Sequence, residues 1–162
     1  VMLKGQLEHG VVYDPLRQEL FTASRGQGAQ LDDRRIRVSK RTQMRQSLIA
    51  TGFPYRGNDQ LIDDYLGMLK EVIKQSTGVR RPGSAALDLC YVAAGRVDGF
   101  WEMDLKKWDI AAGALILKEA GGRISDYRGT DNYLNSGHVV AGNPKIYLAL
   151  SELLAPYASD LP

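Results

Sequence analysis

The sequence predicts a layered α/β domain, and three observations support this prediction. The first forty residues consist of short β-forming runs between turns, the later segments alternate between helical and strand patterns, and two helices are almost entirely apolar. A helix that is apolar on all sides is buried between other layers. We therefore expect two interior helices in one domain, for which 162 residues are sufficient.

The amino-terminal forty residues predict an antiparallel meander. The segments DPLRQ, SRGQG and DDRR carry the Asp-Pro, glycine and paired-Asp chemistry of tight turns. We expect SRGQGAQ to be a hairpin rather than a phosphate-binding loop, because it joins two strands and lacks a Lys-Ser/Thr pair. A strand, a glycine turn and a second strand are expected in VMLKGQLEHGVVYDP, and further strands over 11–13, 19–23, 29–31 and 36–38.

The rest of the chain predicts helices and strands in alternation. Apolar residues between 61 and 74 fall on one helical face, which indicates a helix that covers a sheet. The other expected elements are a strand in SLIATGFP, a helix from the N-cap Ser84 to the C-cap Gly95, a strand in VDGFWEM, a helix that starts at Asp109, strands in GRISDYRG and HVVAGN, and a last helix that starts at Asn143-Pro144.

The composition argues against several classes of protein. A net charge of +2, with bases and acids interspersed, gives no sign of nucleic-acid binding. No segment resembles a membrane span or a signal peptide, so we expect a cytoplasmic protein. Cys90 has no disulfide partner and is expected in the core. His9 and His138 lack ligands at metal-site spacing and are expected to be structural or surface residues.

Asp109 directly precedes a long apolar run in the stretch WDIAAGALILKEAGG. An Asp at a helix start accepts hydrogen bonds from free backbone N–H groups, and this alone would explain the residue. The same geometry also suits a carboxylate that faces a hard cation with oxygen ligands. The residues by themselves leave both interpretations open.

Two further groups would join Asp109 if the apolar helices lie side by side. Glu102 ends a predicted strand, and residues 80–85, RRPGSA, form a glycine turn into a helix start where N–H groups and a guanidinium can bind an anion. Each group has an ordinary structural explanation, namely capping or surface exposure. Together the three groups suit a phosphorylated polyol, whose two ends need opposite electrostatics.

At this point the sequence resembles a known family. WDIAAGALILKEAGG is similar to the carboxyl-terminal signature of the inositol monophosphatase family, and RRPGSAALDLCYVAAGRVDGFWE and HVVAGNP resemble its bacterial SuhB-type members. The resemblance covers essentially all 162 residues and implies the C-terminal part of the family's layered αβαβα sandwich. Family members carry a Glu-Glu segment and an Asp-Pro-apolar-Asp-Gly-Thr motif farther upstream, which this sequence lacks. We therefore expect residues 1–162 to be the C-terminal portion of a longer domain.

The resemblance also implies roles for particular residues. Asp109 would be the one family metal ligand present and would also touch the substrate, while Glu102 would accept hydrogen bonds from inositol hydroxyls. The remaining substrate-binding residues would be Arg80, Gly83, Ser84 and Ala85. Asp104 departs from the family, which usually has Gly at this position, so the substrate preference is open.

The implied activity is Mg²⁺-dependent hydrolysis of inositol monophosphate, or a related sugar phosphate, in a Li⁺-inhibited and homodimeric enzyme. With Asp109 as the only metal ligand, residues 1–162 alone are expected to be inactive. The alternative implied by the SuhB-type resemblance is a phosphatase-fold protein that binds a partner in the bacterial transcription (antitermination) machinery.

Overall fold

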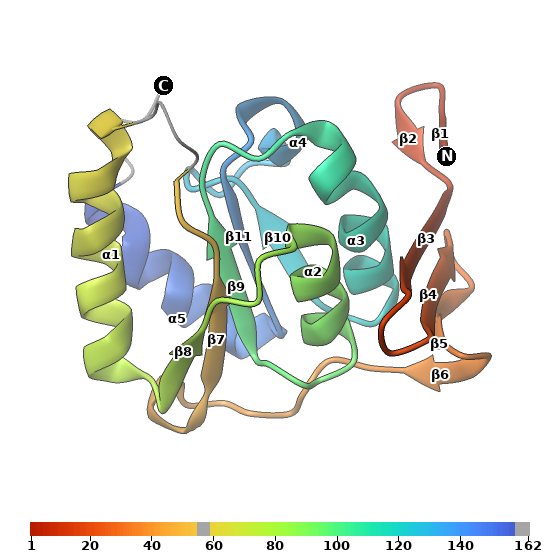
Figure 1. Cartoon of the computed structure of the whole chain (residues 1–162), viewed down its shortest axis with the longest axis horizontal. Helices are drawn as coiled ribbons and strands as arrows, with labels where there is room; N and C mark the ends of the chain where they lie inside the picture. Colours follow the sequence, from red (N-terminus) through yellow and green to blue (C-terminus); the bar gives the residue numbers. More distant parts are fainter. Residues whose placement is uncertain (55–58, 158–162) are drawn as a thin grey trace.

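The computed structural model describes residues 1–54 and 59–157, and its centre is a five-stranded sheet with the strand order β10-β11-β9-β7-β8 (Figure 1). β7 runs parallel to β8 and β9, whereas β11 is antiparallel to β9 and β10. The carboxyl ends of β7 and β9 therefore lie at the same edge of the sheet. The strands are β7 (Leu48–Thr51), β8 (Gly78–Arg80), β9 (Gly99–Glu102), β10 (Arg123–Ser125) and β11 (Val139–Gly142).

The amino-terminal meander is confirmed as a second, antiparallel sheet with the strand order β3-β4-β5-β6. The last strand lies at 34–36 rather than at the expected 36–38, because Asp32 and Asp33 both adopt positive φ, +48° and +63°, and so form the tight turn themselves. The strands are β3 (His9–Asp14), β4 (Glu19–Ser24), β5 (Gly28–Leu31) and β6 (Arg34–Ile36), preceded by the short pair β1 (Met2–Leu3) and β2 (Gln6–Leu7).

The helices form two layers, as the fold class predicted. α1 (Ile62–Gln75) and α5 (Pro144–Leu154) cover one face of the five-stranded sheet, and α2 (Ala85–Ala93) and α3 (Lys107–Glu119) lie between the two sheets (Figure 1). The order of layers is therefore helix, sheet, helix, sheet. Within the described residues, no helix combines the length and the apolar character that a bilayer crossing needs.

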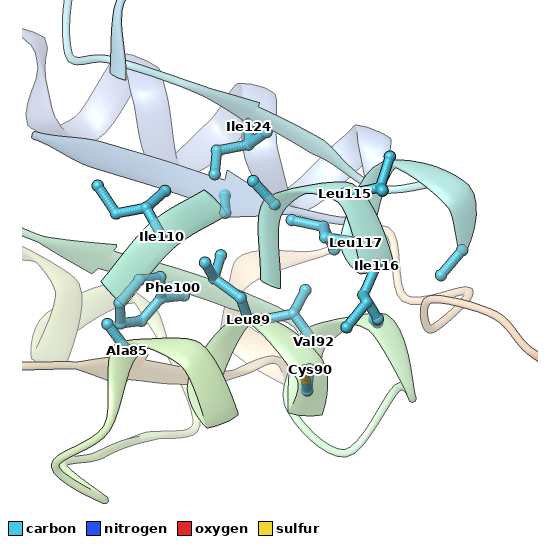
Figure 2. Packing of buried hydrophobic residues seen from close by; sticks show 14 of the residues in the cluster. Ala85, Leu89, Cys90, Val92, Phe100, Ile110, Leu115, Ile116, Leu117 and Ile124 are labelled. Atoms are coloured by element: carbon cyan, nitrogen blue, oxygen red, sulfur yellow. The ribbon is translucent and has the colours of Figure 1, made fainter. Parts of the chain in front are cut away.

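The interior position of α2 and α3 explains why they are apolar all round. Phe21 of the four-stranded sheet and Phe100 of the five-stranded sheet belong to the same buried cluster as both helices. In Figure 2, Leu89 and Val92 of α2 point toward the side chains of α3. The buried apolar residues of the two helices are Ala85, Leu89, Cys90, Val92, Ala93, Ile110, Ala114, Leu115, Ile116 and Leu117.

Small residues allow α3 to approach both of its neighbours closely. A Cβ atom added at Gly113 would lie 2.8 Å from Cβ of Leu89 in α2. On the other side, a Cβ added at Gly10 in β3 would lie 2.8 Å from the carbonyl oxygen of Ala112. Real atoms do not approach this closely in a packed interior, so a methyl group at either position would push α3 away from its neighbour.

The predicted helix starts are correct in two cases and wrong in one. Ser84 Oγ accepts the N–H of Leu87 at 3.5 Å, and Asn143 caps α5 before Pro144. However, α3 begins at Lys107 rather than at Asp109, and Asp109 is the third residue of the helix. Its Oδ2 reaches back to accept the N–H of Lys106 at 3.1 Å, which still satisfies a free donor of the helix end.

The glycine turn between β4 and β5 is confirmed as a hairpin. Its amides nevertheless bind an anion, since the N–H groups of Gly26 and Gly28 donate to the carboxylate of Glu119 at 2.8 and 2.7 Å. Glu119 is the last residue of α3, so this carboxylate ties the interior helix to the four-stranded sheet.

Among the strands and α-helices of the described residues, β8 and the single turn of α4 (Tyr133–Ser136) were not predicted. Cys90 is buried as expected, and burial raises the pKa of its thiol. His9 is exposed and contacts Ser24 Oγ at 2.9 Å, whereas His138 is buried and stacks on Tyr127. Both histidines thus have the structural or surface positions that the sequence indicated.

Candidate active site

Glu102 lies at the carboxyl edge of the five-stranded sheet, as the last residue of β9. Its carboxylate rests against Gly52, which follows β7, so closely that a Cβ at position 52 would lie 2.0 Å from Oε1. The side chain can occupy this place only because residue 52 is glycine. On the other side, the Tyr127 hydroxyl donates to the backbone carbonyl of Glu102 at 3.2 Å and holds the end of the strand.

Asp88 is a buried carboxylate that was not among the site residues predicted from the sequence. It lies in the first turn of α2, has no exposed surface, and neither of its oxygens has a hydrogen-bond partner. Burial raises the pKa of Asp88 to about 7, although the nearby Arg81 opposes this rise. The signal that could have revealed it is a charged residue inside an otherwise apolar helix, SAALDLCYVAAG.

Glu102 shares its surroundings with Asp88 and Asp109. Burial raises the pKa of Glu102 to about 7, and the charges of Asp88 and Asp109 add to this effect, whereas Arg81 opposes it. The charges of two other carboxyl groups and one guanidinium thus lie close enough to influence the protonation of Glu102. Groups with such perturbed pKa values are typical of functional sites.

The structure separates the two adjacent arginines. The Arg81 guanidinium lies 4.9 Å from the centre of the Phe53 ring, on the side of the carboxylates. The Arg80 side chain folds back over Gly78 and lines a hollow that includes Leu48 and Asp98, near the amino ends of the strands. Consecutive side chains at the end of a strand point in opposite directions, so Arg80 and Arg81 lie on different surfaces of the molecule. The cation beside the carboxylates is therefore Arg81 and not Arg80, the residue expected from the sequence.

The glycine turn before α2 has the expected shape. Gly83 adopts a φ of +99°, and a Cβ there would lie 3.1 Å from the Arg81 guanidinium. Ser84 is half-buried and caps the helix, while the side chain of Ala85 is buried in the core. Ala85 can therefore meet a ligand only through its backbone N–H group, at the positive end of the helix dipole.

Asp109 stands near the start of α3 and is half-buried. Both α2 and α3 run downward from the upper side of Figure 1, so their amino ends face the same way as the carboxyl ends of β7 and β9. The two helix starts and Glu102 thus lie at one end of the molecule.

Asp104 has a backbone conformation that explains the usual glycine of the family. Its φ is +55°, in the left-handed region that glycine adopts without cost. The backbone N–H of Asp104 donates to His138 Nδ1 at 3.4 Å, and its carboxylate pairs with Lys106 at 3.2 Å. The extra charge is thus partly neutralised by a neighbouring lysine.

This set of groups can bind hydroxyl groups on one side and an anion on the other. The carboxylates can accept hydrogen bonds from hydroxyl groups, and the α2 amino end with Arg81 can receive an anion. Among the described residues, no group of three or more His, Cys, Asp or Glu side chains comes together in a way that could hold a metal ion.

Comparisons with known proteins show which proteins the chain is similar to. The model of the inositol monophosphatase family matches residues 1–161. A Pseudomonas aeruginosa protein named Nus factor SuhB is 54% identical over 155 residues, which are 95% of this chain and 57% of that protein.

Solved structures have the same fold. The extragenic suppressor protein SuhB from Bartonella henselae superposes with a TM-score of 0.89 at 46% identity, over 93% of this chain and 57% of the other. The inositol monophosphatase from Anabaena gives a TM-score of 0.87 at 40% identity, over 92% and 60%. The chain therefore spans less than two thirds of the length of these relatives. The match to the family model over residues 1–161, together with these similarities, shows that the chain belongs to the inositol monophosphatase family.

Proposed function

We propose that this chain is the C-terminal portion of a phosphatase that hydrolyses inositol monophosphate or a related polyol phosphate, with Mg²⁺ as cofactor. The observation that carries the proposal is the placement of Glu102, held against Gly52 and within electrostatic range of Asp88, Asp109 and Arg81. A polyol phosphate needs hydroxyl acceptors at one end and positive groups at the other, and this cluster provides both.

In the proposed complex, Glu102 accepts hydrogen bonds from ring hydroxyls. The amino end of α2, with Gly83, Ser84 and Ala85, lines the substrate, and Arg81 takes the basic role that the sequence analysis gave to Arg80. Because a raised pKa keeps part of the Glu102 population protonated near neutral pH, this residue can also donate one hydrogen bond to a hydroxyl oxygen.

The described residues alone do not fit a magnesium site. Mg²⁺ requires near-octahedral oxygen ligands and usually more than one carboxylate or substrate oxygen. Asp109 can supply one oxygen, but no described cluster supplies the others. We propose that the other protein ligands come from the part of the longer relatives that this chain does not match. The bound ion would activate water and neutralise the phosphate.

The test compares two proteins in a phosphate-release assay with inositol monophosphate and Mg²⁺. One is the 162-residue chain alone, and the other is the same chain preceded by the amino-terminal part of the P. aeruginosa relative. We expect turnover only in the fusion. Mg²⁺-dependent turnover by the chain alone within about tenfold of the fusion would contradict the assignment of a single ligand. A folded fusion that is inactive on a panel of sugar phosphates would overturn the proposed activity.

Two substitutions in the fusion test the residue roles. Glu102→Gln is expected to raise KM more than it lowers kcat, because a contact far from phosphorus contributes mostly uniform binding. Asp109→Asn is expected to abolish turnover while substrate binding falls less. A fall of about a thousandfold in kcat with unchanged KM for Glu102→Gln would instead place this residue in the chemistry.

A second candidate function is binding to the transcription machinery, and it is favoured by the name Nus factor that a 54% identical relative carries. The Asp109→Asn variant separates the two functions in a cell that depends on the longer protein. If the variant loses all phosphatase turnover and still supports growth, the binding role is the physiological one. If growth fails together with turnover, the phosphatase is the essential function.

A further inference from the structure

A hollow of about 700 Å³ lies at the amino ends of β7 and β8, away from the carboxyl edge that bears Glu102. Leu48 at the start of β7, Thr77 just before β8 and Gly95 just after α2 form part of its lining. The lining also contains four cationic side chains and one carboxylate, that of Asp98. These cations are Lys40, Arg41, Arg80 and Arg96.

Two of these four cations, Lys40 and Arg41, belong to one strongly basic segment of the chain. Residues 34–45, RRIRVSKRTQMR, carry six cations and no acid, and the net charge of +2 for the whole chain hides this run. The segment consists of β6 and most of the connection that runs from it along the lower side of the molecule to β7 (Figure 1). Its inner side is fixed, since Ser39 Oγ donates to Asp98 at 2.5 Å, and Asn143 Nδ2 donates to Ser39 Oγ at 2.9 Å and to the Arg41 carbonyl at 3.1 Å.

The charges that line the hollow do not balance. Asp98 is buried and already accepts hydrogen bonds from Ser39 and from the N–H of Leu48, in addition to an ion pair with Arg41 at 3.5 Å. Arg96 is held by Glu19 in a two-point ion pair at 2.6 and 2.7 Å.

Lys40 and Arg80 are both exposed. Within the described ranges, neither has a carboxylate within 4.0 Å. Two unpaired cations at the rim of a hollow whose only acid is occupied favour an anionic ligand.

The shape of the surface indicates an extended anion. A second hollow of about 820 Å³ is lined by Gln43, Met44 and Arg45 of the same segment and by Lys74 and Gln75 at the end of α1. The described lining of the two hollows includes no aromatic side chain that could stack on a base or a sugar. Recognition here would therefore depend on phosphate charge and not on the identity of attached groups.

We propose that the segment 39–45, together with Arg80, binds an anion with several consecutive phosphate groups. Both inorganic polyphosphate and the phosphodiester backbone of a nucleic acid have this chemistry. The site is separate from the proposed phosphatase site, because it uses the opposite ends of the strands and does not involve Glu102, Asp88 or Asp109.

The test measures the binding of inorganic tripolyphosphate, orthophosphate and a short oligouridylate to the 162-residue chain. Isothermal titration calorimetry at low salt with EDTA keeps divalent cations out of the measurement. We compare the parent chain with the double variant Lys40→Gln/Arg80→Gln. The control Lys70→Gln/Arg123→Gln removes the same charge from exposed positions that do not line either hollow.

We expect tripolyphosphate to bind the parent chain about tenfold more tightly than orthophosphate. The Lys40/Arg80 double variant should bind tripolyphosphate about tenfold more weakly than the parent, and the control variant less than about twofold more weakly. In the Lys40/Arg80 double variant, the slope of log K against log salt concentration should also become shallower, by the amount that corresponds to the loss of about two phosphate contacts. Tighter binding of oligouridylate than of tripolyphosphate would identify a nucleic-acid backbone, and the reverse order an inorganic polyphosphate. Equal loss in both double variants, or no binding of either extended anion, would overturn the proposal.

Discussion

The replacement Asp88→Asn tests whether a buried carboxylate destabilises the chain at neutral pH. Asp88 has no exposed surface and no hydrogen-bond partner, and burial raises its pKa from 3.8 to about 7. Between these two values the folded chain holds a proton that the unfolded chain has already released. The contribution of Asp88 to the free energy of unfolding is therefore greatest below pH 4, falls as the pH rises, and reaches its minimum above pH 7.

The size of the effect follows from the shift. A difference of about three pKa units corresponds to a loss of about 4 kcal/mol at high pH. Asparagine cannot ionise, but its buried amide would itself lack partners, at a cost of about 1–3 kcal/mol. We therefore expect Asp88→Asn to raise the free energy of unfolding by about 2 kcal/mol at pH 8. At pH 5 the ionisation of Asp88 in the unfolded chain has cost only about 1.6 kcal/mol, and the cost of the buried amide cancels the gain.

Urea unfolding followed by circular dichroism at pH 5 and pH 8 measures both values. The control is Asp131→Asn, because the Asp131 side chain is 86% exposed and its ion pair with Lys118 is at the surface. Glu102 also has a raised pKa, so the parent chain and the Asp88→Asn variant both keep part of the pH dependence of stability. The informative quantity is therefore the difference in unfolding free energy between these two proteins at each pH. An Asp88→Asn effect that is the same at the two pH values would refute the reasoning.

Three further predictions concern backbone and packing. Gly52→Ala should force the Glu102 carboxylate into solvent, so NMR titration should show the pKa of Glu102 lower than in the parent; an unchanged pKa would contradict the contact. Asp104→Gly should unfold at a free energy about 1 kcal/mol higher than Asp104→Ala, since only glycine adopts positive φ freely, and equal midpoints in urea would argue against strain at this position. Glu119→Ala should lower the free energy of unfolding by about 2 kcal/mol and speed hydrogen exchange at the amides of Gly26 and Gly28, whereas unchanged exchange would show that the carboxylate does not hold them.

Patterns that depend on neighbours in the chain predicted most of the fold. The meander, the amphipathic α1 and the caps Ser84 and Asn143 all follow from local turn, period and capping chemistry. The same reasoning put the start of α3 at Asp109, because an Asp is a favoured cap and Lys106 is not. The predicted cap Asp109 and the actual N-cap Lys106 differ by three residues, because Asp109 caps the helix from inside it.

The site was less predictable because its properties depend on the tertiary structure. Asp88 appears in the sequence as one polar residue in an apolar helix, and only packing shows that both of its oxygens lack partners. The different directions of Arg80 and Arg81 depend on where β8 pairs with β7. The close contact between Gly52 and Glu102 joins residues fifty positions apart, which no local pattern reports.

The carboxylate of Glu119 has a mechanical consequence. Asp109 and Glu119 stand at opposite ends of α3, about 15 Å apart along the axis, and a helix is stiff in that direction. Because Glu119 holds the amides of the β4–β5 turn, a displacement of that turn along the axis moves the whole rod and carries Asp109 with it. The surface hairpin and the candidate active site are thus linked through the rigid helix α3.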